Sequence, residues 1–181
     1  MKKLGIISLL ILLTQPVVAQ RYMTQNGVIS FFSSTPVEDI EAINNQVSAV
    51  LNAENGEIAS VLLMKAFNFE KALMQEHFNE KYVESEKYPK STFKGKIVNF
   101  SDLDLSANKP NTVRIKGSLS IHGVSNEIEV EGLLTNTNGI MVLKFDFIVA
   151  VADYDIEIPG PVKEKIAKSI KIDAHFKMNE M

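Results

Sequence analysis

The sequence contains no cysteine and no tryptophan among its 181 residues. The absence of cysteine excludes disulfide bonds, thiolate nucleophiles and thiolate metal ligands. It also leaves no site for attaching a lipid to an N-terminal cysteine. We therefore expect the fold to be stabilised by its hydrophobic core alone.

Basic residues are in a minority, with 19 lysines and arginines against 22 aspartates and glutamates and a net charge of -3. Proteins that bind nucleic acids owe much of their affinity to basic side chains that neutralise phosphates. We therefore predict no nucleic-acid partner.

Long apolar runs are also scarce, and the clearest one covers residues 4–13. It follows Lys2 and Lys3 and precedes Pro16 and the small-residue site Val17-Val18-Ala19, which is the arrangement of a secretory signal peptide. A membrane-spanning helix needs about 20 apolar residues, roughly twice this length. We expect cleavage after Ala19 and a mature protein in the periplasm or secreted, with no lipoprotein anchor. Its 17 basic and 22 acidic residues give it a net charge of -5.

Residues 20–181 have the length of one domain, and hydrophobic and charged residues make up 45% and 23% of the chain, as in a globular protein. Apolar and polar residues alternate with period two along most of this part, which predicts half-buried strands. In the last strand the inner row is Ile170, Ile172, Ala174, Phe176 and Met178.

About eight strands are predicted in this way, with hairpin turns at Asn55-Gly56, Gly123 and Asn138-Gly139. They cover Gly27 to Ser33, Val47 to Ala53, Glu57 to Asn68, Ser91 to Asn99, Asn111 to Ile121, Asn126 to Thr135, Ile140 to Ala152 and Ile170 to Met178. Phe69 to Val83 lacks the alternation and predicts a short helix or ordered loop, and a helical turn is expected from Val162 to Lys168. Eight antiparallel strands are enough to close a small barrel that is filled by side chains or holds one small ligand.

In the predicted hairpin after Asn111, an outer row of basic residues lies opposite an outer row of glutamates. Arg114 and Lys116 lie on one strand, and Glu127, Glu129 and Glu131 on the next. Opposite charges across a hairpin favour its pairing. The segment from Asn111 to the last strand is therefore expected to form an antiparallel meander.

The three histidines do not form a recognisable catalytic or metal motif. The nearest candidate for a weak metal site is His77 with Glu76, Glu80 and Glu84; on a helix His77 would lie near Glu80, with Glu84 beyond it. One imidazole with carboxylates lacks the ligand set of a zinc centre, so a solvated polar face is the favoured interpretation. His122, beside Gly123, is expected to hydrogen-bond the backbone in a turn, and His175 to point into solvent. We predict no catalytic residues, no cofactor and no metal, and hence a protein that is not an enzyme.

Three segments resemble the YceI-like family of bacterial, often periplasmic, polyisoprenoid-binding proteins with a lipocalin-like barrel. They are residues 84–95 with Lys87-Tyr88-Pro89 and Thr92-Phe93, residues 117–125 with His122-Gly123-Val124, and residues 147–159 with Asp153-Tyr154. The order and spacing agree over most of the mature chain. The resemblance implies an all-β, lipocalin-like antiparallel barrel with one or two short helices, and an apolar small-molecule partner such as an isoprenoid or lipid.

The inner apolar row has two interpretations, a packed core or the wall of a ligand cavity, because any half-buried sheet shows such a row. The resemblance favours the cavity, since inward aromatic and methionine side chains suit an elongated apolar guest. The candidate lining or mouth residues are Met64, Phe78, Tyr82, Phe93, Ile115, Leu119, Phe145, Phe147 and Phe176. A fully packed barrel that acts through surface contacts is the alternative. The sequence leaves transient membrane contact and oligomeric state open.

Overall fold

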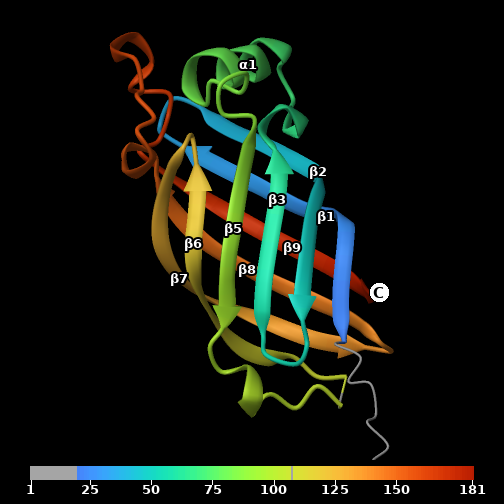
Figure 1. The fold of residues 1–181 in the computed structure, drawn as a ribbon. Coiled ribbons are helices and arrows are strands. Elements are labelled where there is room, and N and C mark those ends of the chain that lie inside the picture. Colours follow the sequence, from blue (N-terminus) through green and yellow to red (C-terminus); the bar gives the residue numbers. More distant parts are fainter. Residues whose placement is uncertain (1–19, 107) are drawn as a thin grey trace, which may run out of the picture.

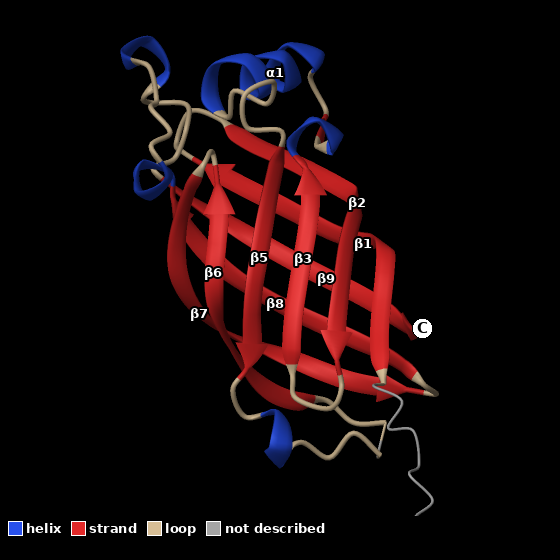
Figure 2. Ribbon diagram, viewed as in Figure 1, coloured by secondary structure: helices blue, strands red, loops and turns tan. Residues whose placement is uncertain are grey.

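The computed structural model describes residues 20–106 and 108–181, which form one antiparallel sheet with short helices at its ends (Figures 1 and 2). The predicted signal peptide lies outside the described residues. The strands are β1 (Arg21–Ser34), β2 (Asp39–Asn52), β3 (Glu57–Leu63), β4 (Asn68–Phe69), β5 (Lys90–Ile97), β6 (Asn111–Ile121), β7 (Val124–Thr137), β8 (Ile140–Ala150) and β9 (Ser169–Glu180).

Eight of these strands close into a barrel. The neighbour order is β1-β9-β8-β7-β6-β5-β3-β2, and β2 pairs back with β1, while the two-residue β4 adds to β2. Every pairing is antiparallel. The predicted all-β antiparallel barrel of about eight strands is therefore confirmed.

The predicted charged hairpin is β6 and β7. Arg114 lies opposite Glu131 and Lys116 opposite Glu129, with 3.8 Å between Lys116 Nζ and Glu129 Oε2. Such exposed pairs contribute little to stability. The register itself is set by the opposite face, where Val113, Ile115 and Val130 are buried.

The first two strands are longer than predicted. β1 begins at Arg21 rather than Gly27, and β2 at Asp39 rather than Val47. The alternation is broken there because the β1–β2 register shifts on both sides of Gly27. A polar residue, Asn44, is also fully buried, where its Nδ2 donates to the Leu63 carbonyl and its Oδ1 accepts from the Gln46 amide. A buried polar side chain whose hydrogen bonds are made is stable, but it interrupts the alternation of apolar and polar residues by which a strand is predicted.

Two other predicted boundaries were wrong. The strand that begins at Glu57 ends at Leu63 rather than Asn68, because the chain turns through a 3-10 helix, η1 (Met64–Ala66). The helical turn expected from Val162 to Lys168 is instead the short 3-10 helix η5 (Gly160–Val162), with Pro161 in its first turn. The remaining strand ends differ from the prediction by three residues or fewer.

The segment predicted as a short helix or loop is helical over 11 residues. It comprises α1 (Ala72–His77) and a π-helical turn, η2 (Phe78–Tyr82). It covers one end of the barrel together with η1, as Figure 1 shows, and we call residues 64–83 the lid. Within the described residues, no helix is long and apolar enough to cross a membrane.

The end of the barrel away from the lid is filled with side chains. Leu51, Ile97, Val113, Leu134, Leu143 and Met178 point into this end and are 0% exposed. Close packing of this kind leaves no room for a guest. We call this half of the barrel the base.

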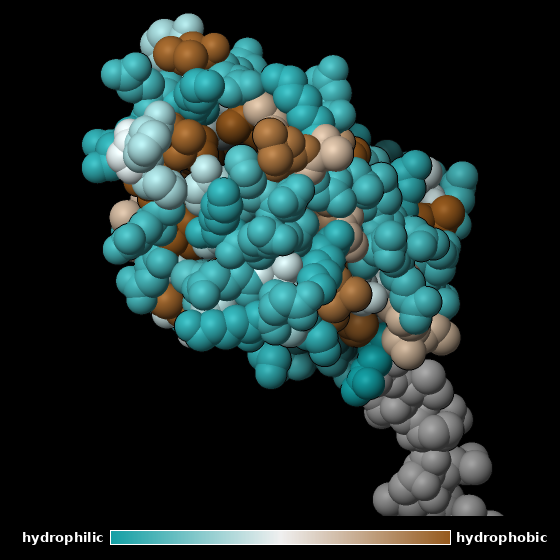
Figure 3. All heavy atoms as spheres, turned by 90° about the horizontal axis from the view of Figure 1, so that it is seen from above, coloured by the Kyte–Doolittle hydropathy of each residue, from teal (hydrophilic) through white to brown (hydrophobic). Residues whose placement is uncertain are grey.

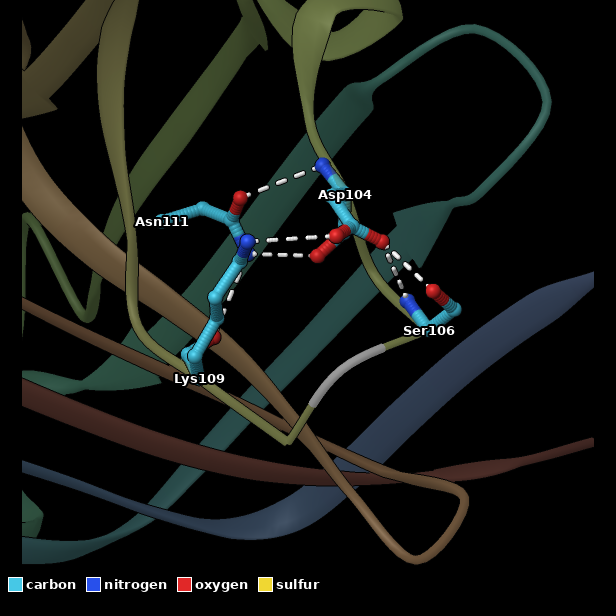
Figure 4. Close-up of polar contacts among 4 residues, drawn as sticks. All are labelled: Asp104, Ser106, Lys109 and Asn111. Atoms are coloured by element: carbon cyan, nitrogen blue, oxygen red, sulfur yellow. Dashed lines mark hydrogen bonds and ion pairs between the residues drawn. The ribbon is translucent and has the colours of Figure 1, made fainter.

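The loop between β5 and β6 lies at the base and is organised by its own polar contacts (Figure 4). Asp104 Oδ1 accepts hydrogen bonds from the Ser106 amide and hydroxyl, and Asp104 Oδ2 lies 3.2 Å from Lys109 Nζ. The Ser106 and Lys109 hydrogen bonds lower the pKa of the exposed Asp104 carboxyl. The Asn111 side chain joins the loop to β6 by accepting from the Asp104 amide and donating to the Asp104 carbonyl.

Candidate ligand-binding cavity

The half of the barrel beneath the lid holds a cavity of about 480 Å³. Inward-facing residues of the strands form its wall and residues of the lid form its roof. Its polar lining side chains are Ser33, Glu38, Lys71, His77, Tyr82, Ser91 and Lys165, and the other lining side chains are apolar. Its volume lies within the range of roughly 300–1,000 Å³ that is typical of small-molecule sites.

Four phenylalanines join the lid to the wall. Phe31 comes from β1, Phe67 and Phe69 from the segment after η1, and Phe78 from η2. Their ring centroids lie 5.0–5.7 Å apart in stacked, tilted and edge-on pairs. Aromatic pairs in these arrangements are worth roughly 0.5–1.5 kcal/mol each beyond the area they bury. The lid therefore covers part of the cavity with an apolar cluster.

The rim of the cavity combines an ion pair with exposed apolar side chains. Lys71 Nζ lies 2.9 Å from Glu38 Oε1, and this hydrogen bond raises the pKa of Lys71. Val37 and Leu73, next to these residues in the chain, are 59% and 61% exposed. Seen onto this end, apolar side chains are scattered among hydrophilic ones (Figure 3). Burial raises the pKa of the Tyr82 hydroxyl.

A second, much smaller cavity of about 40 Å³ lies deeper in the barrel. Ile29, Leu62, Ser91, Leu119 and Phe147 line both cavities. Phe176, Phe145 and Ile115 line only the deeper one, and the Phe145 and Phe176 rings meet edge-on at 5.8 Å. The space inside the barrel thus narrows toward the base.

A family model for the YceI-like domain matches residues 22–178, nearly the whole described part of the chain. The chain belongs to the YceI-like family. The resemblance found in the sequence is thereby confirmed. A search of curated proteins finds no match.

Two solved structures share the fold of this YceI-like chain. A polyisoprenoid binding domain from Saccharophagus degradans, implicated in plant cell wall breakdown, superposes with a TM-score of 0.79 at 14% identity and covers 91% of this chain and 100% of its own. BcnA from Burkholderia cenocepacia superposes with a TM-score of 0.69 at 14% identity, over 84% and 95% of the two chains. At 14% identity, these structural similarities show a shared fold and nothing more.

The YceI-like barrel brings all nine sequence-predicted lining residues to the two cavities. Met64, Phe78, Tyr82, Leu119 and Phe147 line the large cavity, and Phe93, Ile115, Phe145 and Phe176 line the small one with Leu119 and Phe147. Their side chains are buried or half-buried. Whether they contact a ligand stays a prediction.

Sequence reasoning missed several residues of the first strand, the lid and the loops. Phe31, Phe67, Phe69 and Ile156 line the large cavity. Phe67 and Phe69 could have been found, because these two aromatics, with one residue between them, stand where the predicted strand meets the segment without alternation. Ile156 carries no local signal, since it lies in the loop after η4 (Val151–Tyr154).

His122 lies in a turn and hydrogen-bonds the backbone, as predicted. It also contacts Glu84 and Tyr88 in the segment that follows the lid. Its ring nitrogens lie 3.1 Å from the Tyr154 carbonyl oxygen and 2.9 Å from Glu84 Oε2, and its ring meets Tyr88 edge-on at 4.4 Å. His122 has a φ of +52°, and Gly123 a φ of +79° with Tyr88 packed on it. A side chain at Gly123 would be strained and would collide with the Tyr88 ring.

The two other histidines have different surroundings. His77 lines the large cavity, and Glu84, its expected neighbour, bonds His122 instead. In residues 20–106 and 108–181 no group of three or more histidines and carboxylates could hold a metal ion. His175, which we expected to point into solvent, is half-buried between its neighbours, and its Nε2 has no hydrogen-bond partner. That expectation was wrong because His175 lies between Val28 of β1 and Lys144 of β8, its partners on the neighbouring strands.

Proposed function

We propose that this YceI-like protein sequesters or carries an isoprenoid or another long apolar molecule inside the barrel. The observation that carries the proposal is the 480 Å³ cavity with its almost wholly apolar wall. An apolar lining leaves no polar group unpaired when the guest displaces water from it. The polyisoprenoid binding domain that shares the fold supports the same class of ligand.

The cavity argues against the alternative of a fully packed barrel that acts only through its surface. A packed barrel of this size would be filled down its whole length, as it is at the base. The half beneath the lid is hollow instead. Around His77, the described residues contain no group of three or more histidines and carboxylates that could hold a metal ion.

Carriage or sequestration fits the energetics better than catalysis. Removing a five-carbon isoprene unit from water is worth roughly 4 kcal/mol at about 0.8 kcal/mol per carbon. A bilayer is an equally favourable apolar environment for the ligand, so the barrel must retain the ligand through the shape fit of its cavity.

We further propose that the protein is exported, with residues 1–19 as a cleaved signal peptide. An intact mass that matches a chain beginning at Gln20 would support export. A chain that still begins at Met1 and is recovered from the membrane fraction would contradict it.

Thermal unfolding with and without a guest tests the proposal. Farnesol, a three-unit isoprenoid, should raise the Tm, because a ligand that binds only the folded state at 100 times its Kd adds about 2.7 kcal/mol to the free energy of unfolding. For a domain of this size we expect a rise of roughly 5–10 °C. Butanol, which shares the hydroxyl but has a short tail, is the control. Equal melting curves with and without farnesol and longer polyprenols would refute the proposed function.

A further inference from the structure

We infer that the cavity selects isoprenoids of about fifteen to twenty carbons, and that Phe147 and Phe176 set this limit. The inference rests on the proposed function and specifies its ligand. It follows from three features: the combined length of the two cavities, the volume of the large one, and the side chains that close the barrel beneath them.

The combined length of the two cavities, including the constriction at Phe147, follows from β9. Ile170 lies on the large cavity and Phe176 on the small one, six residues further along the same strand. A rise of about 3.4 Å per residue and a strand tilt of about 40° give roughly 15 Å along the barrel axis. An extended chain of carbon–carbon bonds of about 1.5 Å advances about 1.25 Å per bond, so about twelve bonds span this length. The main chain of a farnesyl group has about this length.

The volume gives a similar answer independently. A water-sized group occupies about 30 Å³, so the 480 Å³ of the large cavity hold roughly 16 such groups. A methylene is about as large as a water molecule. Three to four isoprene units therefore fill the cavity, whereas an eleven-unit chain would need several times this volume.

The Phe176 side chain forms a rigid floor beneath the two cavities. Phe176 is 1% exposed, and its ring is held between Phe145 and β1. On the β1 side the backbone of Gly27 approaches so closely that a Cβ there would lie 2.8 Å from Phe176 Cδ1. The ring therefore cannot retreat from a longer tail, and the packed base lies beneath it.

Phe147 narrows the passage above this floor. Its side chain lines both cavities and stacks on Phe145 with a centroid distance of 6.1 Å. The space below it, about 40 Å³, admits one or two water-sized groups. At the other end the four-phenylalanine cluster of the lid covers part of the opening. Isoprene units beyond the capacity of the cavity would therefore extend through the opening into water, where their apolar surface is not buried.

The test is a competition among three alcohols that differ only in the number of isoprene units. Purified mature protein is mixed with farnesol, geranylgeraniol and undecaprenol in phosphatidylcholine vesicles, the vesicles are removed, and the bound alcohols are read by native mass spectrometry. We expect farnesol or geranylgeraniol in the complex at least about tenfold above undecaprenol. Equal or greater occupancy by undecaprenol would overturn the chain-length limit and leave the proposed function standing. No bound alcohol of any length would refute the proposed function itself.

Variants test the role of Phe147. Phe147→Ala joins the two cavities and should shift the preference from farnesol toward geranylgeraniol by about tenfold, because more of the longer tail is buried. Phe147→Leu, a smaller change, serves if the alanine variant does not fold. Phe32→Ala is the matched control, since Phe32 lies on the outer face of β1 and is 40% exposed. An unchanged ratio of the two alcohols in a folded Phe147 variant would overturn its assignment.

Discussion

At the scale of single residues, Phe176 and His175 are neighbours on β9 with opposite surroundings. Phe176 is 1% exposed inside the barrel, whereas His175 lies half-buried on the outer face, opposite Lys144. Phe176→Asp buries an unpaired charge and should lower the free energy of unfolding by more than about 4 kcal/mol. His175→Asp places a carboxylate near two lysines and should change it by less than about 1 kcal/mol. Urea unfolding measures both, and equal losses would contradict the register of β9.

His175 also gives stability a pH dependence. Burial, and then the charges of Lys144 and Lys177, lower the pKa of His175 from its usual value of 6.5. Above pH 6.5 the imidazole is neutral in the folded and the unfolded chain. As the pH falls below 6.5 the unfolded chain binds the proton first, so the free energy of unfolding decreases. His175→Gln should remove this part of the decrease between about pH 7 and pH 5. A difference between the two proteins that stays constant over this range would contradict the assignment.

At the scale of strands, β7 and β8 pair over only part of their lengths. Their ladder runs from Thr137 opposite Ile140 to Gly132 opposite Phe145, and the described residues give Val124–Glu131 no further strand partner on the β8 side. Beyond the end of this ladder, the Asn126 side chain bonds the Asp153 carbonyl at 2.6 Å. The outer side chain there, Ile148, is 72% exposed.

We call the stretch where β7 and β8 are not paired the seam. It predicts uneven hydrogen exchange along β7. Amides of residues 127–131 that point toward β8 should exchange at least about tenfold faster than the amides of residues 133–137 that point toward β8, where the two strands are paired. Hydrogen–deuterium exchange followed by NMR resolves the two segments within one strand. Equal protection of both segments would show that the seam is closed in solution.

The sequence predicted the strands where alternation is regular and failed where another force replaces it. The pairing of β6 with β7 follows from the charged rows around Lys116, and the inner row of β9 follows from its pattern. The first half of β2 was missed because Asn44 is buried with its own hydrogen bonds. The end of β3 was missed because an apolar run continues through the 3-10 turn at Met64. The local alternation of apolar and polar residues does not show where a β-bulge or a 3-10 turn interrupts a strand.

At the scale of the whole molecule, the barrel is filled at the base and hollow beneath the lid. Alternation predicted which side chains of the strands face inward, whereas Phe78 and Tyr82 lie in the segment without alternation. All nine candidate residues line one of the two cavities. Alternation could not predict how much space they leave, because volume depends on residues that meet from strands far apart in the sequence. The aromatic cluster of Phe31, Phe67 and Phe78 illustrates this, since Phe31 comes from β1 and the other two come from the lid.

The most direct test of the account is to identify what the protein carries. The mature chain is purified gently without detergent, its intact complex is weighed by native mass spectrometry, and the same sample is extracted with organic solvent. We predict an added mass that matches an extracted apolar chain, retained in the 480 Å³ cavity. Bare protein in the spectrum, together with melting curves that farnesol and longer polyprenols leave unchanged, would contradict the central claim.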